Sequence, residues 1–174
     1  FFLINGSGVN TKKFKFNVNN LKNITFTMVS RLIKEKGILE FLRAAEMIKE
    51  ENKNILFILA GHVPKNKKLR HRIEKLHDNN TINYLGFVEN IVPVLDQTSV
   101  FVLPSYYREG VPRAVLEAMS SGRAIITTNL PGCRETIIEG KNGYFVKEKD
   151  TQDLYIKMLN FIADPNKIKI MGFE

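Results

Sequence analysis

The chain has 174 residues, of which 44% are hydrophobic and 25% charged, a composition typical of one globular domain. Its 26 Lys and Arg residues against 18 Asp and Glu residues give a net charge of +8. The longest apolar runs, residues 55–60 and 100–103, are far shorter than the ~20 residues that span a bilayer. The one cysteine, Cys133, excludes an intrachain disulfide and fits a reducing compartment.

Short apolar runs alternate with helical patterns along the chain. In chain order, the sequence predicts a strand at 24–29, a helix at 38–50, a strand at 55–60, a helix at 67–77, a strand at 81–85, a short helix at 90–97, a strand at 100–103, a helix at 112–121, a strand at 124–128, a short helix at 134–139, a strand at 144–146, a helix capped by Asp150 and a helical pattern at 167–174. This alternation predicts an α/β fold, a Rossmann-like parallel sheet with helices on both faces. Ligands of such sheets bind beyond the carboxyl ends of the strands.

The positive charge is spread rather than gathered in a nucleic-acid-binding motif. The densest group, between Lys65 and Arg72, lies opposite Leu69 and Ile73 and is predicted to be a solvated helix face. The sequence contains no recognition-helix pattern, zinc-finger spacing or RNP aromatic motif, so we expect no nucleic acid as a partner. Attachment to an anionic membrane surface stays open as an alternative.

The first strand leads into a loop with two cations, Arg31 and Lys36. Two cations beside a helix N-terminus suit a diphosphate. The alternative is an ordinary solvated basic loop.

The strand at 100–103 leads into a loop that carries Glu109 and then a helix. Gly110 lets the backbone approach a ligand, and free N–H groups at a helix start can bind an anion. Because Pro112 has no N–H group, the candidate donors are Gly110, Val111, Arg113 and Ala114.

Glu117 is a carboxylate in an otherwise apolar helical stretch and needs a partner there. The ribose hydroxyls of a nucleotide would suit it. The alternative is a structural ion pair with Arg123 or Arg134.

The strand at 81–85 ends before Phe87 and Val88, whose backbone could bind a base while Val88 packs on its ring. The alternative is an ordinary strand end. His62, at the end of the strand at 55–60, could also contact a ligand.

Several common sites are missing from the sequence. Gly6 and Gly8 lack the third glycine of the dinucleotide fingerprint, and there is no Walker A motif and no Asp-x-Asp. The histidines show no ligand spacing, so we expect no metal site. Cys133 has no nearby histidine and is expected to fill a loop rather than act as a nucleophile.

Together, these segments resemble the C-terminal domain of retaining glycosyltransferases of family 4, the group 1 glycosyltransferases, which have the GT-B fold. The resemblance covers residues from about 5 to 163 and depends on the order and spacing of its motifs. These are Gly6-Ser7-Gly8-Val9-Asn10, Val29-Ser30-Arg31-Leu32, Glu35-Lys36-Gly37, Leu59-Ala60-Gly61, Leu85-Gly86-Phe87-Val88, residues 100–105, the Glu109 and Glu117 pair, Glu117-Ala118-Met119 and Asn142-Gly143. Ser30 and Asn10 stand where the family more often has Gly and Asp.

The resemblance assigns a role to each candidate residue. Arg31 and Lys36 would neutralise the donor diphosphate, and Glu109 would bind hydroxyls of the donor sugar as a positioning group rather than a covalent catalyst. The remaining contacts would be Gly110 and Val111 on the sugar, Arg113 and Ala114 on phosphate, Glu117 on the ribose, and Phe87 with Val88 at the base. No metal or cofactor is expected, because the two cations take its place.

The resemblance also implies a function. We expect the whole of residues 1–174 to be one donor-binding domain, with the acceptor-binding N-terminal domain absent from this chain, so that the chain alone binds nucleotide but is inactive in transfer. The enzyme would transfer a hexose or N-acetylhexosamine, with retention, from a UDP-sugar to a glycan or lipid-linked acceptor in bacterial surface polysaccharide synthesis. It would be cytoplasmic or at the inner face of the membrane. A related-fold nucleotide-sugar enzyme and a non-catalytic nucleotide-binding or interaction module are the alternatives.

Overall fold

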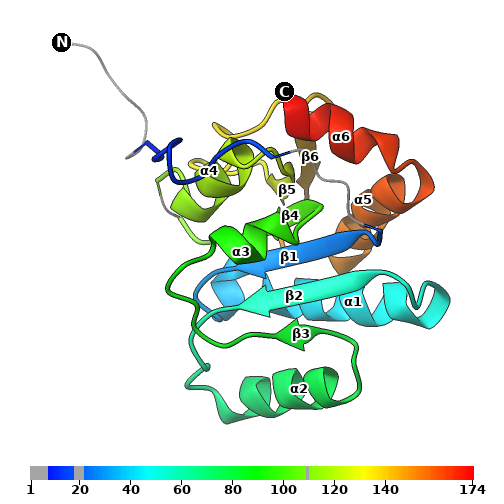
Figure 1. Ribbon diagram of the computed structural model, residues 1–174. Helices are drawn as coiled ribbons and strands as arrows, with labels where there is room; N and C mark the ends of the chain where they lie inside the picture. Colours follow the sequence, from blue (N-terminus) through cyan, green and yellow to red (C-terminus); the bar gives the residue numbers. More distant parts are fainter. Residues whose placement is uncertain (1–7, 18–21, 109) are drawn as a thin grey trace.

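The computed structural model describes residues 8–17, 22–108 and 110–174, and its centre is a parallel sheet with helices on both sides (Figure 1). Within the described residues the sheet has six strands in the order β3-β2-β1-β4-β5-β6, and every neighbouring pair is parallel. The strands are β1 (Thr25–Val29), β2 (Leu56–Ala60), β3 (Asn83–Tyr84), β4 (Val100–Leu103), β5 (Ala124–Thr128) and β6 (Gly143–Val146). The predicted Rossmann-like α/β fold is confirmed.

The helices cover both faces because the strand order reverses beside β1. They are α1 (Ile38–Glu51), α2 (Lys67–Asp78), α3 (Val92–Asp96), α4 (Arg113–Ser120), α5 (Thr151–Ala163) and α6 (Asn166–Phe173), with a 3-10 turn, η1, at Lys34–Lys36. Right-handed crossovers to opposite sides of β1 place α1 and α4 on opposite faces. Accordingly α1 packs against α5, while α4 and α6 pack against β5, and Figure 1 shows α1 behind β2 and α3 in front of β1.

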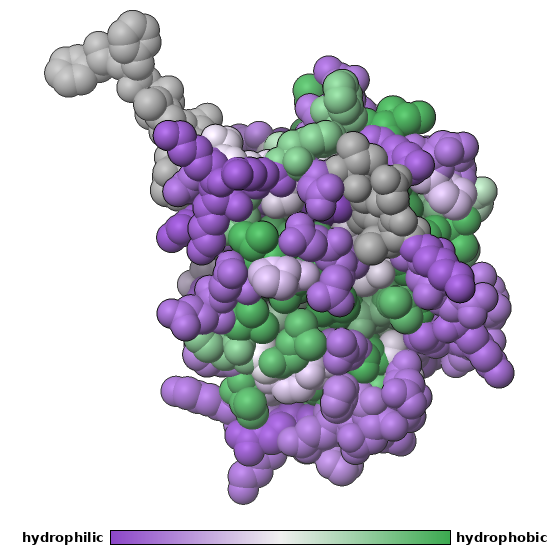
Figure 2. Space-filling model, in the orientation of Figure 1, coloured by the Kyte–Doolittle hydropathy of each residue, from purple (hydrophilic) through white to green (hydrophobic). Residues whose placement is uncertain are grey.

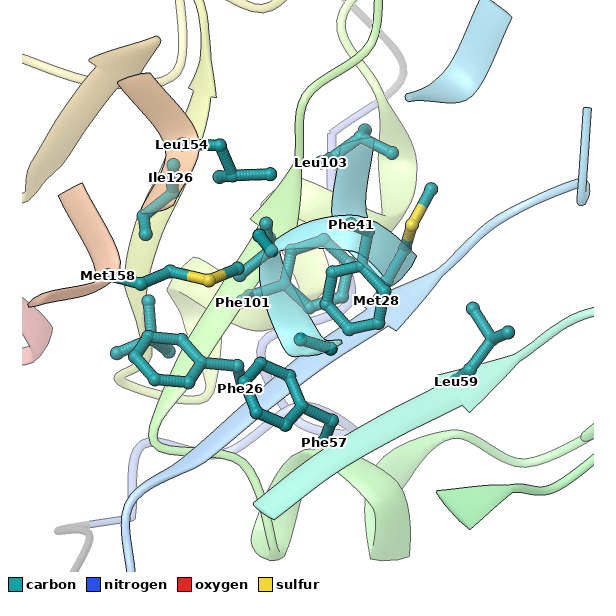
Figure 3. Close-up of a cluster of buried hydrophobic side chains, with 14 of the residues drawn as sticks. Phe26, Met28, Phe41, Phe57, Leu59, Phe101, Leu103, Ile126, Leu154 and Met158 are labelled. Carbon is teal, nitrogen blue, oxygen red and sulfur yellow. The ribbon is translucent and has the colours of Figure 1, made fainter. Parts of the chain in front are cut away.

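The core is built where β1 and β2 meet α1 and α5. Phe26 and Phe57 are partners in register across β1 and β2, and their rings stack with centroids 5.6 Å apart. Phe41 of α1 meets Phe57 edge-on at 6.0 Å. Figure 3 shows the side chains of Leu154 and Met158, from α5, extending the same cluster. This buried layer fixes the strands, and so the position of the loops at their carboxyl ends.

Helix α2 has one buried face and one solvated face, as its sequence predicts. Its apolar face is buried through Leu69, Ile73 and Leu76. Figure 2 shows hydrophilic side chains along the lower edge of the molecule, where α2 lies. Arg72 of α2 forms an ion pair with Glu46 of α1, with 2.8 Å between Nη2 and Oε2.

Two predicted elements differ from the structure. The segment 134–139 is not a helix: residues 134–136 form turns, and Glu139 makes an isolated parallel bridge with Gly143. Side chains compete there for the backbone, since the Thr136 hydroxyl donates to the Cys133 carbonyl and the Asn142 side chain bonds to Ile138 N–H and the Thr136 carbonyl. The predicted strand at 81–85 is reduced to β3, because this edge strand pairs only with Ile58 and Leu59 of β2.

The loops after β1 and β4 meet at Gly37. This residue ends η1 with φ +77°, in the left-handed region, and its N–H donates to the Lys34 carbonyl at 2.8 Å. A Cβ at this position would collide with the backbone carbonyl of Pro104. Glycine is therefore required both by the backbone angle and by the approach of the second loop.

The substitution Gly37→Ala is expected to lower the free energy of unfolding by at least about 3 kcal/mol, through left-handed strain together with overpacking. The matched control is Gly86→Ala, where φ is +69° but a Cβ would meet nothing within 4 Å. That change should cost about 1–2 kcal/mol from strain alone. Urea denaturation of both variants measures the difference, and equal losses would contradict the proposed collision with Pro104.

Candidate functional site

The two cations of the loop after β1 differ in their exposure to solvent. The chain turns tightly, with Ile33 N–H donating to the Arg31 carbonyl at 2.9 Å and Lys36 N–H donating to the Ile33 carbonyl at 3.1 Å. Arg31 is exposed, whereas Lys36 is only 6% exposed. A lysine this buried is rare unless its charge is compensated, so the alternative of a merely solvated basic loop fits Arg31 better than Lys36.

The loop after β4 is tied to the loop after β1 by hydrogen bonds to one carbonyl group. The Glu35 carbonyl accepts from Tyr106 N–H at 2.8 Å and from the Ser105 hydroxyl at 3.3 Å. On its other side, the Ser105 carbonyl accepts from the Thr128 hydroxyl of β5. The carboxyl ends of β1, β4 and β5 are thus joined into one edge.

Tyr107 is a residue of this edge that the sequence analysis missed. Its ring centroid lies 5.1 Å from the Arg31 guanidinium carbon and 5.0 Å from Lys36 Nζ. The structure thus brings the two predicted diphosphate ligands together on one aromatic ring. The pair of adjacent tyrosines at 106–107, just before Glu109, is the only sequence signal that could have indicated it.

Helix α4 begins at this edge directly after Pro112. Its hydrogen bonds start with Val115 N–H donating to the Pro112 carbonyl at 3.1 Å. The N–H groups that precede this bond, at Arg113 and Ala114, therefore stand at the positive end of the helix. Gly110, exposed and open around its Cα, leads into the helix together with half-buried Val111, whereas Glu109 lies outside the described residues.

Glu117 is held in an apolar setting one turn into α4. Its side chain is 16% exposed, and its Oε1 lies 3.8 Å from Nη2 of Arg113. Burial raises the pKa of Glu117, and the charges of Arg113 and Lys13 lower it in part. This carboxylate is therefore only partly compensated within the described residues.

Arg123 is not the partner of Glu117. It is 2% exposed and donates to the carbonyls of Thr98 at 3.2 Å and Asn17 at 3.1 Å. Desolvation lowers its pKa, while Asp96 raises it. Arg123 therefore joins segments at the amino ends of β4 and β5, the opposite ends of these strands from the site. The ion pair that the structure shows for Glu117 is with Arg113.

The ends of β2 and β3 form a second aromatic feature. The rings of His62 and Phe87 stack at 4.1 Å with an interplanar angle of 11°, and Phe87 is 62% exposed. Gly61 N–H donates to the Gly86 carbonyl at 2.8 Å and holds the two loops together. Val88 beside them is half-buried.

A cavity of about 760 Å³ opens between the loops after β1 and β2, and Arg31 and His62 both contribute to its lining. Within residues 8–17, 22–108 and 110–174 there is no cluster of His, Cys, Asp and Glu able to hold a metal ion. In the same part of the chain, no helix has the length and hydrophobicity to cross a membrane.

The substitution Glu117→Gln is expected to stabilise the protein at pH 7. A folded-state pKa above the ordinary 4.5 gives stability that is present below pH 4.5 and is lost as the pH rises through the folded value. The free energy of unfolding of wild type should therefore fall relative to that of Glu117→Gln as the pH rises from 4 to 7.

Urea denaturation at the two pH values measures this gap. Glu74→Gln, on the exposed face of α2, is the control and should show no such gap. A Glu117→Gln variant less stable than wild type at pH 7 would show that the carboxylate is structural.

Comparison with known proteins agrees with this architecture. Residues 9–172 match the family model of glycosyl transferases group 1. The C-terminal domain of a group 1 glycosyl transferase, LpcC from Francisella tularensis, superimposes with a TM-score of 0.80 at 23% identity, over 95% of this chain and 93% of that one.

Two curated relatives are similar over almost the whole chain. The N,N'-diacetylbacillosaminyl-diphospho-undecaprenol alpha-1,3-N-acetylgalactosaminyltransferase of Campylobacter jejuni is 32% identical over 170 residues, 98% of this chain and 43% of the relative. The UDP-Gal:alpha-D-GlcNAc-diphosphoundecaprenol alpha-1,3-galactosyltransferase of Escherichia coli is 30% identical over 169 residues, which are 94% of this chain and 43% of the relative. The chain thus spans less than half the length of these relatives. With a family model matched across nearly all of its residues, the chain belongs to the glycosyl transferases group 1.

Proposed function

We propose that this chain is the donor-binding domain of a retaining glycosyltransferase and that it binds a UDP-sugar at the edge formed by the loops after β1 and β4. The observation that carries the proposal is the convergence of Arg31 and Lys36 at Tyr107, where the strand order reverses. This is the position at which doubly wound sheets bind ligands.

In this proposal the diphosphate of the donor lies between the two cations and the start of α4. When the bond to the sugar breaks, negative charge develops on the leaving diphosphate, and cations already in place stabilise it most effectively. The N–H groups of Arg113 and Ala114 at the positive end of the helix would add to this stabilisation. No metal ion is needed, because the side chains of Arg31 and Lys36 supply the charge.

The rest of the donor would follow the edge in both directions. The sugar would contact Glu109 and the N–H groups of Gly110 and Val111, with Glu109 orienting it for transfer with retention. The ribose hydroxyls would bind the carboxylate of Glu117, whose burial and long 3.8 Å ion pair with Arg113 leave it open to such a ligand.

The base would lie near Phe87 and Val88 at the end of β3. The exposed ring of Phe87, stacked on His62, offers a flat apolar surface of the kind on which bases pack. Uracil is proposed because the Escherichia coli relative is named for UDP-Gal.

The donor sugar is proposed to be a hexose or an N-acetylhexosamine, since the two relatives are named for galactose and N-acetylgalactosamine transfer. Both are also named for diphospho-undecaprenol acceptors, and this supports the proposal that the reaction belongs to bacterial surface polysaccharide synthesis at the inner face of the membrane. Acceptor binding would require the part of these relatives that this chain does not match. The chain by itself would then bind the donor without transferring its sugar.

The variant Lys36→Met is expected to weaken UDP binding roughly 10- to 100-fold, the effect of losing a charge-assisted hydrogen bond to phosphate. Methionine keeps most of the buried stem, so the fold should persist. Calorimetric titration with UDP, GDP and ADP measures the effect, and EDTA should leave the UDP affinity unchanged.

Lys75→Met, on the exposed face of α2 and outside the cavity that Arg31 and His62 line, removes the same charge away from the site and should leave UDP affinity within about twofold of wild type, because exposed charges act weakly at a distance. If folded wild type binds no nucleoside diphosphate, the donor-site proposal is wrong and the interaction-module alternative gains support.

A further inference from the structure

Tyr107 holds an unusual position among the aromatic residues of the structure. The other rings that lie against a cation within the described residues each face a single one, as Tyr106 faces Lys149 at 5.0 Å and Tyr144 faces Lys157 at 5.3 Å. Tyr107 faces both Arg31 and Lys36. These are the two cations that the proposed function assigns to the diphosphate, and the inference that follows rests on that function.

The two cations repel each other, because both lie close to the same ring. Each lies about 5 Å from the same ring centroid, so their charges are no more than about 10 Å apart. Salt screens exposed charges over about this distance, but screening is weaker for a buried group such as Lys36. The electron-rich face of a tyrosine ring attracts cations and so favours the arrangement in which both stay close.

The backbone of Tyr107 is fixed to the loop that carries Lys36. Its N–H donates to the Ser105 hydroxyl oxygen at 3.2 Å, and that hydroxyl donates to the Glu35 carbonyl at 3.3 Å. The backbone that carries the ring is therefore hydrogen-bonded to Glu35, the neighbour of Lys36. Arg31, exposed at the other end of the same loop, lies against the ring.

We propose that Tyr107 is a positioning residue of the donor site, whose ring holds Arg31 and Lys36 in the arrangement that receives the diphosphate. The ring itself makes no bond to the phosphate. It acts by ordering two long side chains before the donor arrives, so that less conformational entropy is lost when the donor binds.

The test compares Tyr107→Leu with Tyr107→Phe in calorimetric titrations with UDP. Two cation–π contacts at a partly exposed site correspond to roughly a 5- to 30-fold loss of affinity for Tyr107→Leu. Tyr107→Phe keeps the ring and should stay within about threefold of wild type. The matched control is Tyr106→Leu, which removes the neighbouring ring and its contact with Lys149 and should change the UDP affinity by less than about twofold.

A double-mutant cycle separates positioning from a general effect on the fold. If Tyr107 acts through Arg31, the loss caused by Tyr107→Leu should shrink by at least half when it is measured in an Arg31→Gln background. A merely structural role would lower the melting temperature and would give the same loss in both backgrounds.

A fluorescence reporter at the same position gives an independent readout. The chain contains no tryptophan, so Tyr107→Trp would introduce a single indole against the two cations. Its emission should change on titration with UDP and remain unchanged with uridine, which lacks the diphosphate.

The outcomes distinguish the positioning role from the donor site itself. If wild type and Tyr107→Phe bind no nucleoside diphosphate, the donor-site proposal fails. If wild type binds UDP and Tyr107→Leu binds it equally well or more tightly, or if Tyr106→Leu loses as much affinity as Tyr107→Leu, the positioning role is wrong while the donor site stands.

Discussion

The close contact between the loops after β1 and β4 is the constraint on which the rest of this edge depends. Gly37 can pass against the Pro104 carbonyl only because it has no Cβ, and the Glu35 carbonyl accepts hydrogen bonds from both Ser105 and Tyr106. Strands β1 and β4 bring these loops together because the sheet order reverses between them. A shift of either loop would separate the cations of the first loop from the tyrosines of the second.

The burial of the Glu117 carboxylate at this edge opposes the stability of the fold. Glu117 lies in an apolar helix with its pKa raised by desolvation, and Nη2 of its partner Arg113 is 3.8 Å from its Oε1. A carboxylate held in an unfavourable electrostatic environment is typical of a functional site, because a ligand can supply the compensation that the free protein lacks. Arg123 shows the contrasting structural solution, since its buried guanidinium is bonded to the carbonyls of Thr98 and Asn17.

The group 1 family match and the site geometry support the same interpretation from independent directions. The match covers residues 9–172, while the geometry concerns side chains at the ends of β1, β3 and β4. The buried core seen in Figure 3, which includes several phenylalanine and methionine side chains, aligns the strands whose ends carry the site. In the proposed function, a rigid sheet therefore supports loops whose chemistry selects the donor.

The amino-acid sequence by itself determined the alternation of strands and helices, since buried parallel strands are short apolar runs and helices repeat every 3.6 residues. It also indicated Arg31, Lys36 and Glu117, because charged side chains at strand ends or in apolar stretches stand out locally. It failed at 134–139, where hydrogen bonds from Thr136 and Asn142 replace helical ones. The meeting of Tyr107 with Arg31 and Lys36 was decided only by the tertiary structure, because residues some 70 positions apart come together through strand order, which no local pattern encodes.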